Sequence, residues 1–439
     1  MNPIEHLPSR LRRRIEASGP IRVGLIGAGK FGSMFLAQVP TSPHLDVAAI
    51  ADLDPGRAKT ACRTVGWSEE RVARTSFLED GSALIAESRV EVVIEATGSP
   101  LAGVRHALAA AREGKHIVMV TVEADVLAGP WLAAVARRAG TVYSLAYGDQ
   151  PALVCEMVDW ARACGFPVVA AGKGTRYQPH YHGLTPATVW SQYGLSQEAA
   201  QAAGMNAQMF CSFMDGTKSA IEMAAIANAT GLKVPEDGLA FPPCGMDDLQ
   251  SVLRPRDAGG VLAGTGFVEV VSSMEQGAID DMERHLRWGV YVVFEAPNDY
   301  ARACFSQYGL KTDTTGRFAA LYRPYHLIGL ELAVSVISAA LNREPTGAPE
   351  AWRGDVVAVA KRDLEPGEVL DGEGGYCVWG KLVPAARSRT LDALPIGLAH
   401  QVSVVRPVLQ GAIVTADDVS ALPFDAAVEA RDEMVRQFG

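Results

Sequence analysis

The sequence predicts an α/β fold: first a doubly wound parallel sheet, then an α+β region, then a small β-rich region. Two observations support this prediction. Strand and helix patterns alternate from residue 23 to about residue 146, as in a parallel sheet with helices on both faces. Mixed elements follow, and after residue 350 short strands alternate with many turns. With 439 residues, the chain is long enough for two or three domains.

The first domain begins with a strand, a glycine-rich turn and a helix. Residues 23–26 are apolar and predict a buried strand, and Gly27-Ala28-Gly29-Lys30-Phe31-Gly32 follows with the spacing G-x-G-x-x-G. A helical segment leads to a second apolar run, residues 47–50, which ends at Asp52. A dinucleotide-binding Rossmann unit requires this order, whereas a merely glycine-rich turn would not explain the flanking strands.

The residues of this turn are therefore candidate cofactor ligands. Gly27 permits the tight turn, Gly29 lets the pyrophosphate approach the backbone, and Gly32 lets the helix pack close to the strand. The phosphates would lie on the free N–H groups at the helix N-terminus, next to Lys30 and Phe31.

Asp52 ends the second strand, 25 residues after Gly27. A carboxylate at this position can bind both ribose hydroxyls, which favours NAD and repels a 2′-phosphate. Arg57 and Lys59 follow in the next turn and could hold that phosphate, so both NAD and NADP remain open. The alternative role for Asp52 is an N-cap of the helix that begins near Pro55.

The rest of the first domain repeats strand and helix. The expected elements are a strand over 90–95, a helix over 101–111, a strand over 116–120, a helix over 131–138 and a strand over 141–145. Ligands of such sheets bind beyond the carboxyl ends of the strands. This places Thr97, Gly98 and Glu123 beside the nicotinamide end of the cofactor.

The middle region has a different pattern. Its expected elements are a helix over 152–163, a strand over 168–172, a helix over 219–230 that ends at Gly231, a strand over 289–295 and a long apolar helix over 325–341. A proline-containing linker over 345–349 then leads to short strands, the first over 355–360. In this last region, residues 371–376 contain three glycines, and we expect the loop to fold over the active cleft; the alternative is a plain turn.

Several motifs together resemble known families. The segments 49–52, 95–98 and 114–118 are similar to the homoserine dehydrogenase and glucose-fructose oxidoreductase group. The segments 359–370 and 411–419 resemble an SAF domain, a small fold shared with sialic acid synthases and altronate dehydratases. A homoserine dehydrogenase-like N-terminal region together with a C-terminal SAF domain, over almost the whole chain, resembles the 1-deoxy-D-xylulose 5-phosphate reductoisomerase-like (type II) proteins. That resemblance implies an NADPH-linked enzyme of isoprenoid precursor synthesis, although many relatives act on other substrates.

The domain division expected from these patterns has five parts. They are an N-terminal arm (1–20), a dinucleotide-binding Rossmann domain (21–150), a substrate and oligomerisation domain (151–345), an SAF-like domain (350–424) and a C-terminal tail (425–439).

Two departures from homoserine dehydrogenases limit the resemblance. Those enzymes carry Asn-Lys-Ala after the fourth strand, where this chain has Val-Glu-Ala, so that Glu123 replaces the lysine. Their Asp and Lys four residues apart on a helix correspond here to Asp215 and Lys218, which are three apart. Ordinary homoserine dehydrogenase activity is therefore not expected.

Lys173 and Arg176 follow the strand that opens the middle region. Reduction of a ketone needs a proton donor at the carbonyl oxygen as the hydride arrives, and Lys173 could donate that proton or stabilise the alkoxide. Arg176 could bind a phosphate or carboxylate of the substrate. The alternative is that both are solvated loop charges.

Asp215, Lys218 and Glu222 have the spacing i, i+3, i+7, which places them on one face of a helix. They could hold the substrate or relay a proton; the alternative is a salt bridge on a wet face. His180 and His182 alternate, so on an extended segment they would point the same way and could bind a divalent cation with Glu222 or Asp215. No specific motif supports a metal.

Arg317, Tyr322, Arg323 and His326 form a polar cluster just before the expected apolar helix. The N-terminus of a helix attracts anions, and two arginines strengthen that attraction. Tyr322 or His326 is a second candidate proton donor. The alternative is a surface segment that caps the helix.

Composition excludes some function classes. The net charge of −10 argues against binding to nucleic acid or to an anionic membrane, and no apolar run is long enough for a membrane span. The seven cysteines include no C-x-x-C pair, which favours reduced thiols in the cytoplasm. We expect a small-molecule substrate and, by analogy, a homodimer or homotetramer.

These observations predict an NAD(P)-dependent oxidoreductase that acts on a small hydroxylated, anionic carbonyl compound. The best single expectation is a deoxyxylulose phosphate reductoisomerase-like enzyme, because of the resemblance. The alternatives are a dehydrogenase of a sugar acid or polyol derivative and a non-catalytic protein that senses NAD(P).

Overall fold

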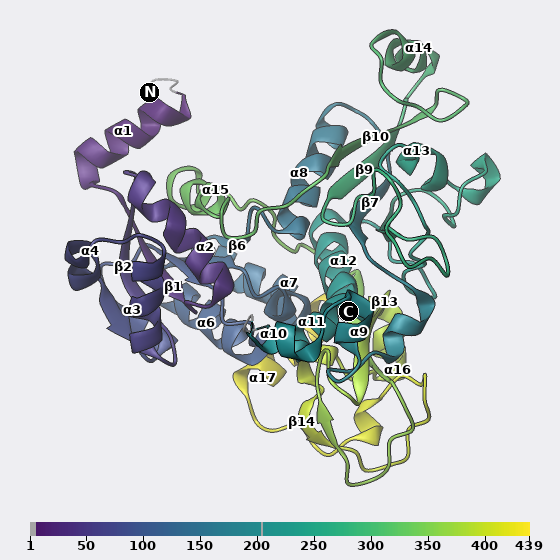
Figure 1. The fold of residues 1–439 in the computed structure, drawn as a ribbon. Coiled ribbons are helices and arrows are strands. Elements are labelled where there is room, and N and C mark those ends of the chain that lie inside the picture. The colour runs from purple at the N-terminus through teal and green to yellow at the C-terminus, as the bar shows by residue number, and fades with distance from the viewer. Residues whose placement is uncertain (1–5, 203–204) are drawn as a thin grey trace. The chain divides into compact units, whose positions relative to one another are not determined.

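The structure is a computed structural model that describes residues 6–202 and 205–439. Contacts divide the chain into two compact units. Figure 1 labels their helices and strands. Unit 1 contains the residues up to Asp125, Trp131–Asp149 and Leu327–Ala348. Unit 2 contains Val126–Pro130, Gln150–His326 and Pro349–Gly439.

Unit 1 holds a six-stranded sheet in the order β3-β2-β1-β4-β5-β6, and every neighbouring pair in it is parallel. The strands are β1 (Ile21–Ile26), β2 (Leu45–Ala51), β3 (Ser76–Leu78), β4 (Val92–Glu95), β5 (His116–Met119) and β6 (Tyr143–Leu145). The predicted parallel sheet is confirmed.

Helices connect these strands. They are α2 (Lys30–Gln38), α3 (Pro55–Thr64), α4 (Glu69–Arg74), α5 (Gly81–Ala86), α6 (Pro100–Arg112) and α7 (Val122–Arg138), and α1 (Leu7–Ser18) precedes the sheet. The apolar core between sheet and helices includes Phe35, Leu36, Ile50 and Ile94, all with no exposed surface.

The segment Leu327–Ala348 returns to unit 1 and completes its core, where Leu332 and Val336 are buried. The predicted long helix over 325–341 is wrong. Instead turns lead to a short helix, α15 (Ala333–Ile337), and to a π-helical turn over 338–342. Gly329, in the left-handed region with φ 79°, interrupts the helix, and a Cβ there would lie 2.7 Å from the Phe31 carbonyl oxygen.

Unit 2 contains a four-stranded sheet in the order β10-β9-β7-β8. Its strands are β7 (Val168–Thr175), β8 (Phe267–Ser272), β9 (Val290–Glu295) and β10 (Phe318–Arg323). Strand β7 runs parallel to β8 and antiparallel to β9, so the sheet is mixed. This is the α+β region that the sequence predicts.

Helix α12 (Thr217–Thr230) contacts β7, β8 and a neighbouring helix, α8 (Gln150–Ala163). It is buried along nearly its whole length, and it ends at Gly231 in the left-handed conformation, as predicted. The other helices between β7 and β10 are α9 (Val189–Tyr193), α10 (Gln197–Ala202), α11 (Ala207–Met214), α13 (Leu249–Val252) and α14 (Asp299–Gln307).

The C-terminal part of unit 2 is rich in short strands. β11 (Gly354–Ala360) pairs with β13 (Val378–Pro384), β12 (Val369–Asp371) pairs with β14 (His400–Ser403), and both pairs are antiparallel. Helix α16 (Ala385–Leu391) lies between β13 and β14, and α17 (Ala426–Phe438) follows β14. A buried ion pair between Arg431 and Asp355 ties α17 to β11. The β-rich character is thus present, while the SAF assignment and the five domain boundaries stay predictions.

Among the described residues, no helix is both long enough and apolar enough to cross a bilayer.

Candidate functional site

The glycine-rich turn has the geometry that a dinucleotide site needs. Gly27 has φ 94°, and a Cβ on it would lie 2.5 Å from the Ala96 carbonyl oxygen. A Cβ on Gly32 would lie 2.3 Å from the Gly27 carbonyl oxygen, so helix and strand touch there. A Cβ on Gly29 would meet nothing within 4 Å, which leaves space over the N-terminus of α2. The residues present therefore fit a cofactor pyrophosphate, with Lys30 and Phe31 in the first turn of the helix.

Asp52 is buried directly after β2 and is bound to this turn. Its Oδ2 accepts a hydrogen bond from Ala28 N at 2.9 Å, and its Oδ1 accepts from Asp54 N at 3.0 Å and from Arg57 Nη2 at 2.7 Å. Burial by itself would raise the pKa of Asp52, but the two backbone N–H groups and the Arg57 guanidinium outweigh burial and lower it. Asp52 is therefore a carboxylate, as a ribose ligand must be.

The N-cap alternative for Asp52 is wrong. The N-cap of α3 is Asp54, whose side chain accepts from Arg57 N at 2.9 Å. The two cations that could hold a 2′-phosphate have different partners. Arg57 forms an ion pair with Asp52, whereas Lys59 lies over the Phe77 ring.

The two turns expected at the nicotinamide end lie together. Gly98 N donates to Thr121 Oγ1 at 3.0 Å, which joins the turn after β4 to the residue before α7. Thr97 Oγ1 donates to Glu95 Oε1 at 2.6 Å and fixes the first of these turns. Glu123 lies in the first turn of α7, next to this joint.

Two buried carboxyl groups beneath these turns were missed by the sequence reasoning. Glu95 and Asp125 have no exposed surface, and each has one oxygen without a hydrogen bond in the described structure. Burial raises the pKa of Asp125 to about 7, although Tyr143 O–H donates to it at 2.9 Å. The sequence did contain a signal for these two buried carboxyl groups, because Glu95 ends an apolar strand pattern and Asp125 lies in an apolar helix pattern.

In unit 2, Lys173 lies inside β7 rather than after it, and it forms an ion pair with Glu222 of α12. Both side chains are buried, at 6% and 3% exposure, so the solvated-loop alternative is wrong for Lys173. The neighbouring glycines keep the strand close to its surroundings: a Cβ on Gly172 would lie 1.9 Å from Glu269 O, and one on Gly174 would lie 2.1 Å from Leu286 O. Lys173 is thus held on an unusually closely packed strand.

Arg176 follows β7 in a small cluster of charges. Asp281 lies 3.7 Å from Arg176 Nη1 and 3.1 Å from Arg287 Nη1, so one carboxylate serves two guanidinium groups. Arg176 Nε is buried and makes no hydrogen bond among the described residues. The cluster keeps one positive charge in excess and could bind an anionic substrate group.

Asp215 is not on the same helix face as Lys218 and Glu222, because α12 begins only at Thr217. Asp215 precedes the helix, and its Oδ1 accepts from Thr217 N at 2.9 Å. Lys218 is partly exposed in the first turn of α12, whereas Glu222 points to Lys173. The predicted charged stripe is therefore wrong, and so is its wet-face alternative, since α12 is buried.

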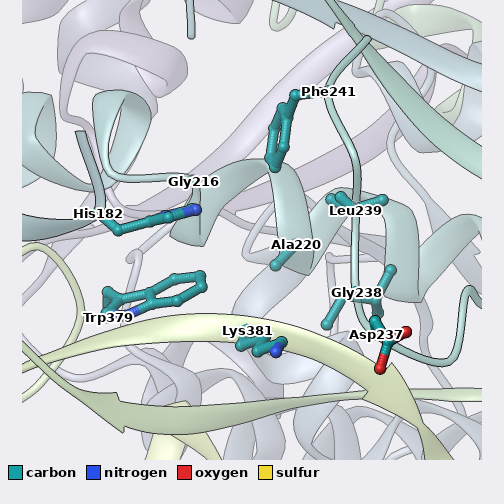
Figure 2. A pocket seen from close by; sticks show the side chains of 10 residues that line it. His182, Gly216, Ala220, Asp237, Gly238, Leu239, Phe241, Trp379 and Lys381 are labelled. Carbon is teal, nitrogen blue, oxygen red and sulfur yellow. The ribbon is translucent and has the colours of Figure 1, made fainter. Parts of the chain in front are cut away.

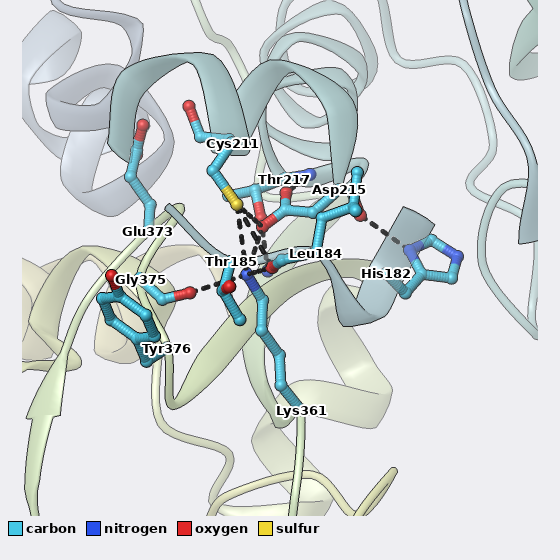
Figure 3. A network of polar contacts seen from close by, with 12 residues as sticks. His182, Leu184, Thr185, Cys211, Asp215, Thr217, Lys361, Glu373, Gly375 and Tyr376 are labelled. Atoms are coloured by element: carbon cyan, nitrogen blue, oxygen red, sulfur yellow. Dashed lines mark hydrogen bonds and ion pairs between the residues drawn. The ribbon is translucent and has the colours of Figure 1, made fainter. Parts of the chain in front are cut away.

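Asp215 instead belongs to a buried network with Lys361, a residue that the sequence reasoning missed (Figure 3). Lys361 Nζ lies 2.8 Å from Asp215 Oδ2 and donates to the carbonyl oxygens of Leu184 at 2.7 Å and Gly375 at 2.8 Å. Cys211 lies at the same network, and burial raises the pKa of its thiol to about 12, so it is not a nucleophile.

The glycine-rich loop 371–376 packs on α11. Gln208 Nε2 donates to the carbonyl oxygens of Asp371 at 2.9 Å and Glu373 at 3.0 Å. A Cβ on Gly374 would lie 2.0 Å from the Gln208 carbonyl oxygen, which explains one of the three glycines. That the loop also covers an active cleft stays a prediction.

His180 and His182 lie on a 3₁₀-helix, Pro179–Gly183, and not on an extended segment. Their side chains therefore separate: His180 is exposed, whereas His182 Nδ1 donates to the Asp215 carbonyl oxygen at 2.7 Å. Burial lowers the pKa of His182, so its Nε2 is unprotonated and accepts from Tyr177 O–H at 2.9 Å. Both ring nitrogens are thus occupied. Within the described residues, no three His, Cys, Asp or Glu side chains converge on a metal position.

The four residues of the predicted polar cluster lie at the edge strand β10 and not at a helix N-terminus. Arg317 comes just before the strand, Tyr322 and Arg323 lie at its end, and His326 comes after it. The expected helix N-terminus is not present because α15 begins only at Ala333. Their partners are separate: Arg317 pairs with Glu295, Tyr322 O–H lies 3.5 Å from Arg284 Nη2, Arg323 lies over Tyr325, and His326 Nδ1 donates to Trp288 O at 2.8 Å. They do not form one cluster.

Comparison with known proteins gives two family matches. Residues 21–121 match the oxidoreductase family with an NAD-binding Rossmann fold, and residues 148–332 match the catalytic domain of oxidoreductase DRL. No curated protein matches the chain.

Several solved structures are similar in part. A probable dehydrogenase from Thermotoga maritima is 14% identical, with a TM-score of 0.40, over 74% of this chain and 90% of that one. An oxidoreductase from Klebsiella pneumoniae, described as putative, is 14% identical, with a TM-score of 0.37, over 75% and 88%. A myo-inositol dehydrogenase from Lactobacillus casei, in complex with NAD(H) and myo-inositol, is 16% identical, with a TM-score of 0.30, over 39% and 50%.

The sheet, the turn at Gly27–Gly32 and the two family matches agree. The chain joins a Rossmann domain to a region that is similar to the catalytic domain of oxidoreductase DRL, and it is an NAD(P)-dependent oxidoreductase.

Proposed function

We propose that this oxidoreductase interconverts a CH–OH group and a carbonyl group on a small, hydroxylated, anionic compound such as a sugar acid or polyol derivative. The observation that carries the proposal is the buried ion pair between Lys173 and Glu222, which lies within the DRL-type catalytic region. NAD(P)H, when bound, supplies the hydride to the carbonyl carbon. Lys173 Nζ supplies the proton to the carbonyl oxygen as the alkoxide develops.

The proposal that the substrate is anionic rests on Arg176 and Arg287. These two guanidinium groups share Asp281, and the excess positive charge would bind a carboxylate or phosphate. Arg176 follows the end of β7, three residues after Lys173.

Activity measurements on variants test this role for Lys173. Full-length protein would be assayed with panels of sugar acids, hydroxy acids and polyols by the absorbance of NADH and NADPH. The variant Lys173→Met should lose about 10²–10⁴-fold in kcat because the proton donor is gone. Its affinity for NADH, measured by fluorescence, should stay within about twofold of the wild type, since the Rossmann turn is untouched.

Two further variants keep this test decisive. Lys173→Met leaves Glu222 buried without its cation, so Lys173→Met/Glu222→Leu removes both charges and preserves packing. Lys233→Met replaces an exposed lysine of unit 2 and should keep full activity. Turnover above a tenth of the wild-type value in either Lys173 variant would refute the proposal. If the protein only senses NAD(P), the wild type itself would show no turnover with any substrate of the panel.

A second candidate is a reductoisomerase that acts on 1-deoxy-D-xylulose 5-phosphate. The order of a Rossmann domain, a DRL-type catalytic region and a β-rich tail favours it, because the resemblance of the sequence implies that architecture. Isomerisation would gain from a divalent cation on vicinal oxygens. The test is NADPH oxidation with this phosphate ester, with and without Mg²⁺ or Mn²⁺, and activity confined to non-phosphorylated acids would remove this candidate.

A further inference from the structure

A cavity of about 190 Å³ lies within unit 2, lined by His182, the start of α12, the 237–241 loop that follows α12, and strand β13 (Figure 2). Neither Lys173 nor Glu222 lines it. A volume of this size is close to that of a cavity that accepts a single benzene-like ring. The cavity is therefore a separate place at which a small molecule could bind, and its ligand does not depend on the proposed function.

Aromatic rings form a wall of the cavity. In this wall His182 stacks on Trp379, with ring centroids 3.9 Å apart and planes 18° apart. Next to this pair is Phe241, which stacks on Tyr177 at 3.9 Å and 15° and whose ring centroid lies 6.3 Å from that of His182, with the planes 65° apart. A Cβ on Gly216 would lie 3.1 Å from His182 Cε1 and 3.6 Å from Phe241 Cζ, so the glycine keeps both rings in place. Flat, rigid walls suit a flat ligand.

Phe241 is held in the cavity at a cost in backbone energy. It has φ 50°, a conformation that is uncommon for a bulky residue. The buried carboxyl of Glu269 fixes this backbone, because it accepts from Ala240 N at 3.0 Å and from Phe241 N at 3.4 Å. Strain that surrounding groups maintain is typical of ligand sites.

The cavity carries one positive charge, that of Lys381, which no carboxylate of the described residues contacts directly. No hydrogen bond or ion pair of Lys381 Nζ is found in the part of the chain that the structure describes. Asp237 also lines the cavity, but it is fully exposed and faces Arg387, whose Nη1 lies 3.8 Å from its Oδ1. Burial, and then Arg387, lower the pKa of Lys381, and Asp237 only partly offsets them; a bound anion would raise that pKa. His182 is neutral, so it neither adds to nor opposes this charge.

We propose that this cavity binds a small monocarboxylic acid with one flat ring, whose carboxylate pairs with Lys381 and whose ring packs against the aromatic wall of His182, Trp379 and Phe241. The positive end of the α12 dipole at Gly216 favours the same anion. A phosphate dianion fits less well, because Lys381 is a single cation and Asp237 would repel the second charge. A neutral ring of the same shape would keep the stacking but lose the charge-assisted hydrogen bond.

Calorimetric titration of the full chain tests this proposal. The probes are benzoate, neutral benzamide, acetate and inorganic phosphate. We expect benzoate to bind with a dissociation constant on the order of 1 mM, at least about tenfold tighter than each of the other three. The variant Lys381→Met should bind benzoate and benzamide equally weakly, and Lys381→Arg should recover part of the difference.

Two more variants decide between outcomes. Ala220→Leu fills the cavity from the buried face of α12 with a good helix former, so it should abolish binding of both ring compounds. Lys233→Met, which replaces an exposed lysine elsewhere in unit 2, should bind benzoate as the wild type does. The proposal is overturned if benzoate does not bind, if phosphate or acetate binds as tightly, or if benzoate still binds to Lys381→Met or Ala220→Leu with unchanged affinity.

Discussion

Loss of the buried Lys361 ammonium should open a defined part of unit 2. The variant Lys361→Met leaves Asp215, which has no exposed surface, with Thr217 N–H as its remaining close hydrogen-bond donor. Breaking a buried ion pair on one side costs about 3–5 kcal/mol. The carbonyl oxygens of Leu184 and Gly375 lose a donor as well, at about 1 kcal/mol each. Methionine keeps the packing of the lysine stem, so we expect a net loss near the lower end of this sum, about 5 kcal/mol.

Hydrogen exchange followed by mass spectrometry is the suitable assay. A chain with two compact units need not unfold in one step, and exchange reports the opening free energy of each segment. The loss should appear in peptides from α11, the start of α12 and loop 371–376, which meet at this network. Peptides from the Rossmann sheet should be unchanged. Lys233→Met serves as the control for loss of a lysine.

A double variant separates the charge from the shape. Asp215→Asn with Lys361→Met removes both charges, so it should be less destabilised than the sum of the two single variants, by about 2 kcal/mol. The reasoning is refuted if Lys361→Met costs less than about 1 kcal/mol in these peptides, or if the two single effects simply add.

Three further predictions concern unit 1. Gly29→Ala should keep the thermal midpoint, because its Cβ meets no protein atom, but should weaken NADH binding at least about tenfold by calorimetry. Gly32→Ala should lower both the thermal midpoint and the NADH affinity, because its Cβ would lie 2.3 Å from the Gly27 carbonyl oxygen. An equal loss of thermal midpoint in the two variants would contradict this. Asp52→Asn should shift the ratio of NADPH to NADH affinity upward about tenfold, because it removes the charge that repels a 2′-phosphate, and an unchanged ratio would count against that role. Burial raises the pKa of Asp125 from 3.8 to about 7, so the folded state retains a proton that the unfolded state releases between these values, and unfolding free energy should fall by at most about 4 kcal/mol as pH rises through that window. Asp125→Asn should flatten that profile in urea titrations, and a parallel profile would show that another group is responsible.

Local patterns predicted the Rossmann sheet because each signal there is short in range. The turn at Gly27–Gly32, the apolar runs of the strands and the glycine that ends α12 each depend on neighbours a few residues away. The apolar run after residue 325 misled the prediction for the same reason. Apolar periodicity indicates burial, but it did not reveal that Gly329 packs against Phe31 and interrupts the helix.

The polar groups of unit 2 were harder to predict because their partners are distant in sequence. Lys173 meets Glu222 across 49 residues, and Asp215 meets Lys361 across 146. Spacing along a helix suggested that Asp215, Lys218 and Glu222 act together, whereas the helix begins after Asp215. No local pattern marks Lys381, since its surroundings come from α12, the 237–241 loop and β13.

The return of Leu327–Ala348 to unit 1 matters during synthesis on the ribosome. The six strands are complete at Leu145, but Leu332 and Val336 of their apolar core are translated almost 200 residues later. At about 5–20 residues per second, the nascent sheet would wait roughly 10–40 s with that part of its core uncovered. Ser335 then bonds to Leu145 O and Tyr147 N and closes the edge beside β6. Chaperones that recognise apolar surface are expected to bind the nascent chain during this interval and to leave once residue 348 has emerged.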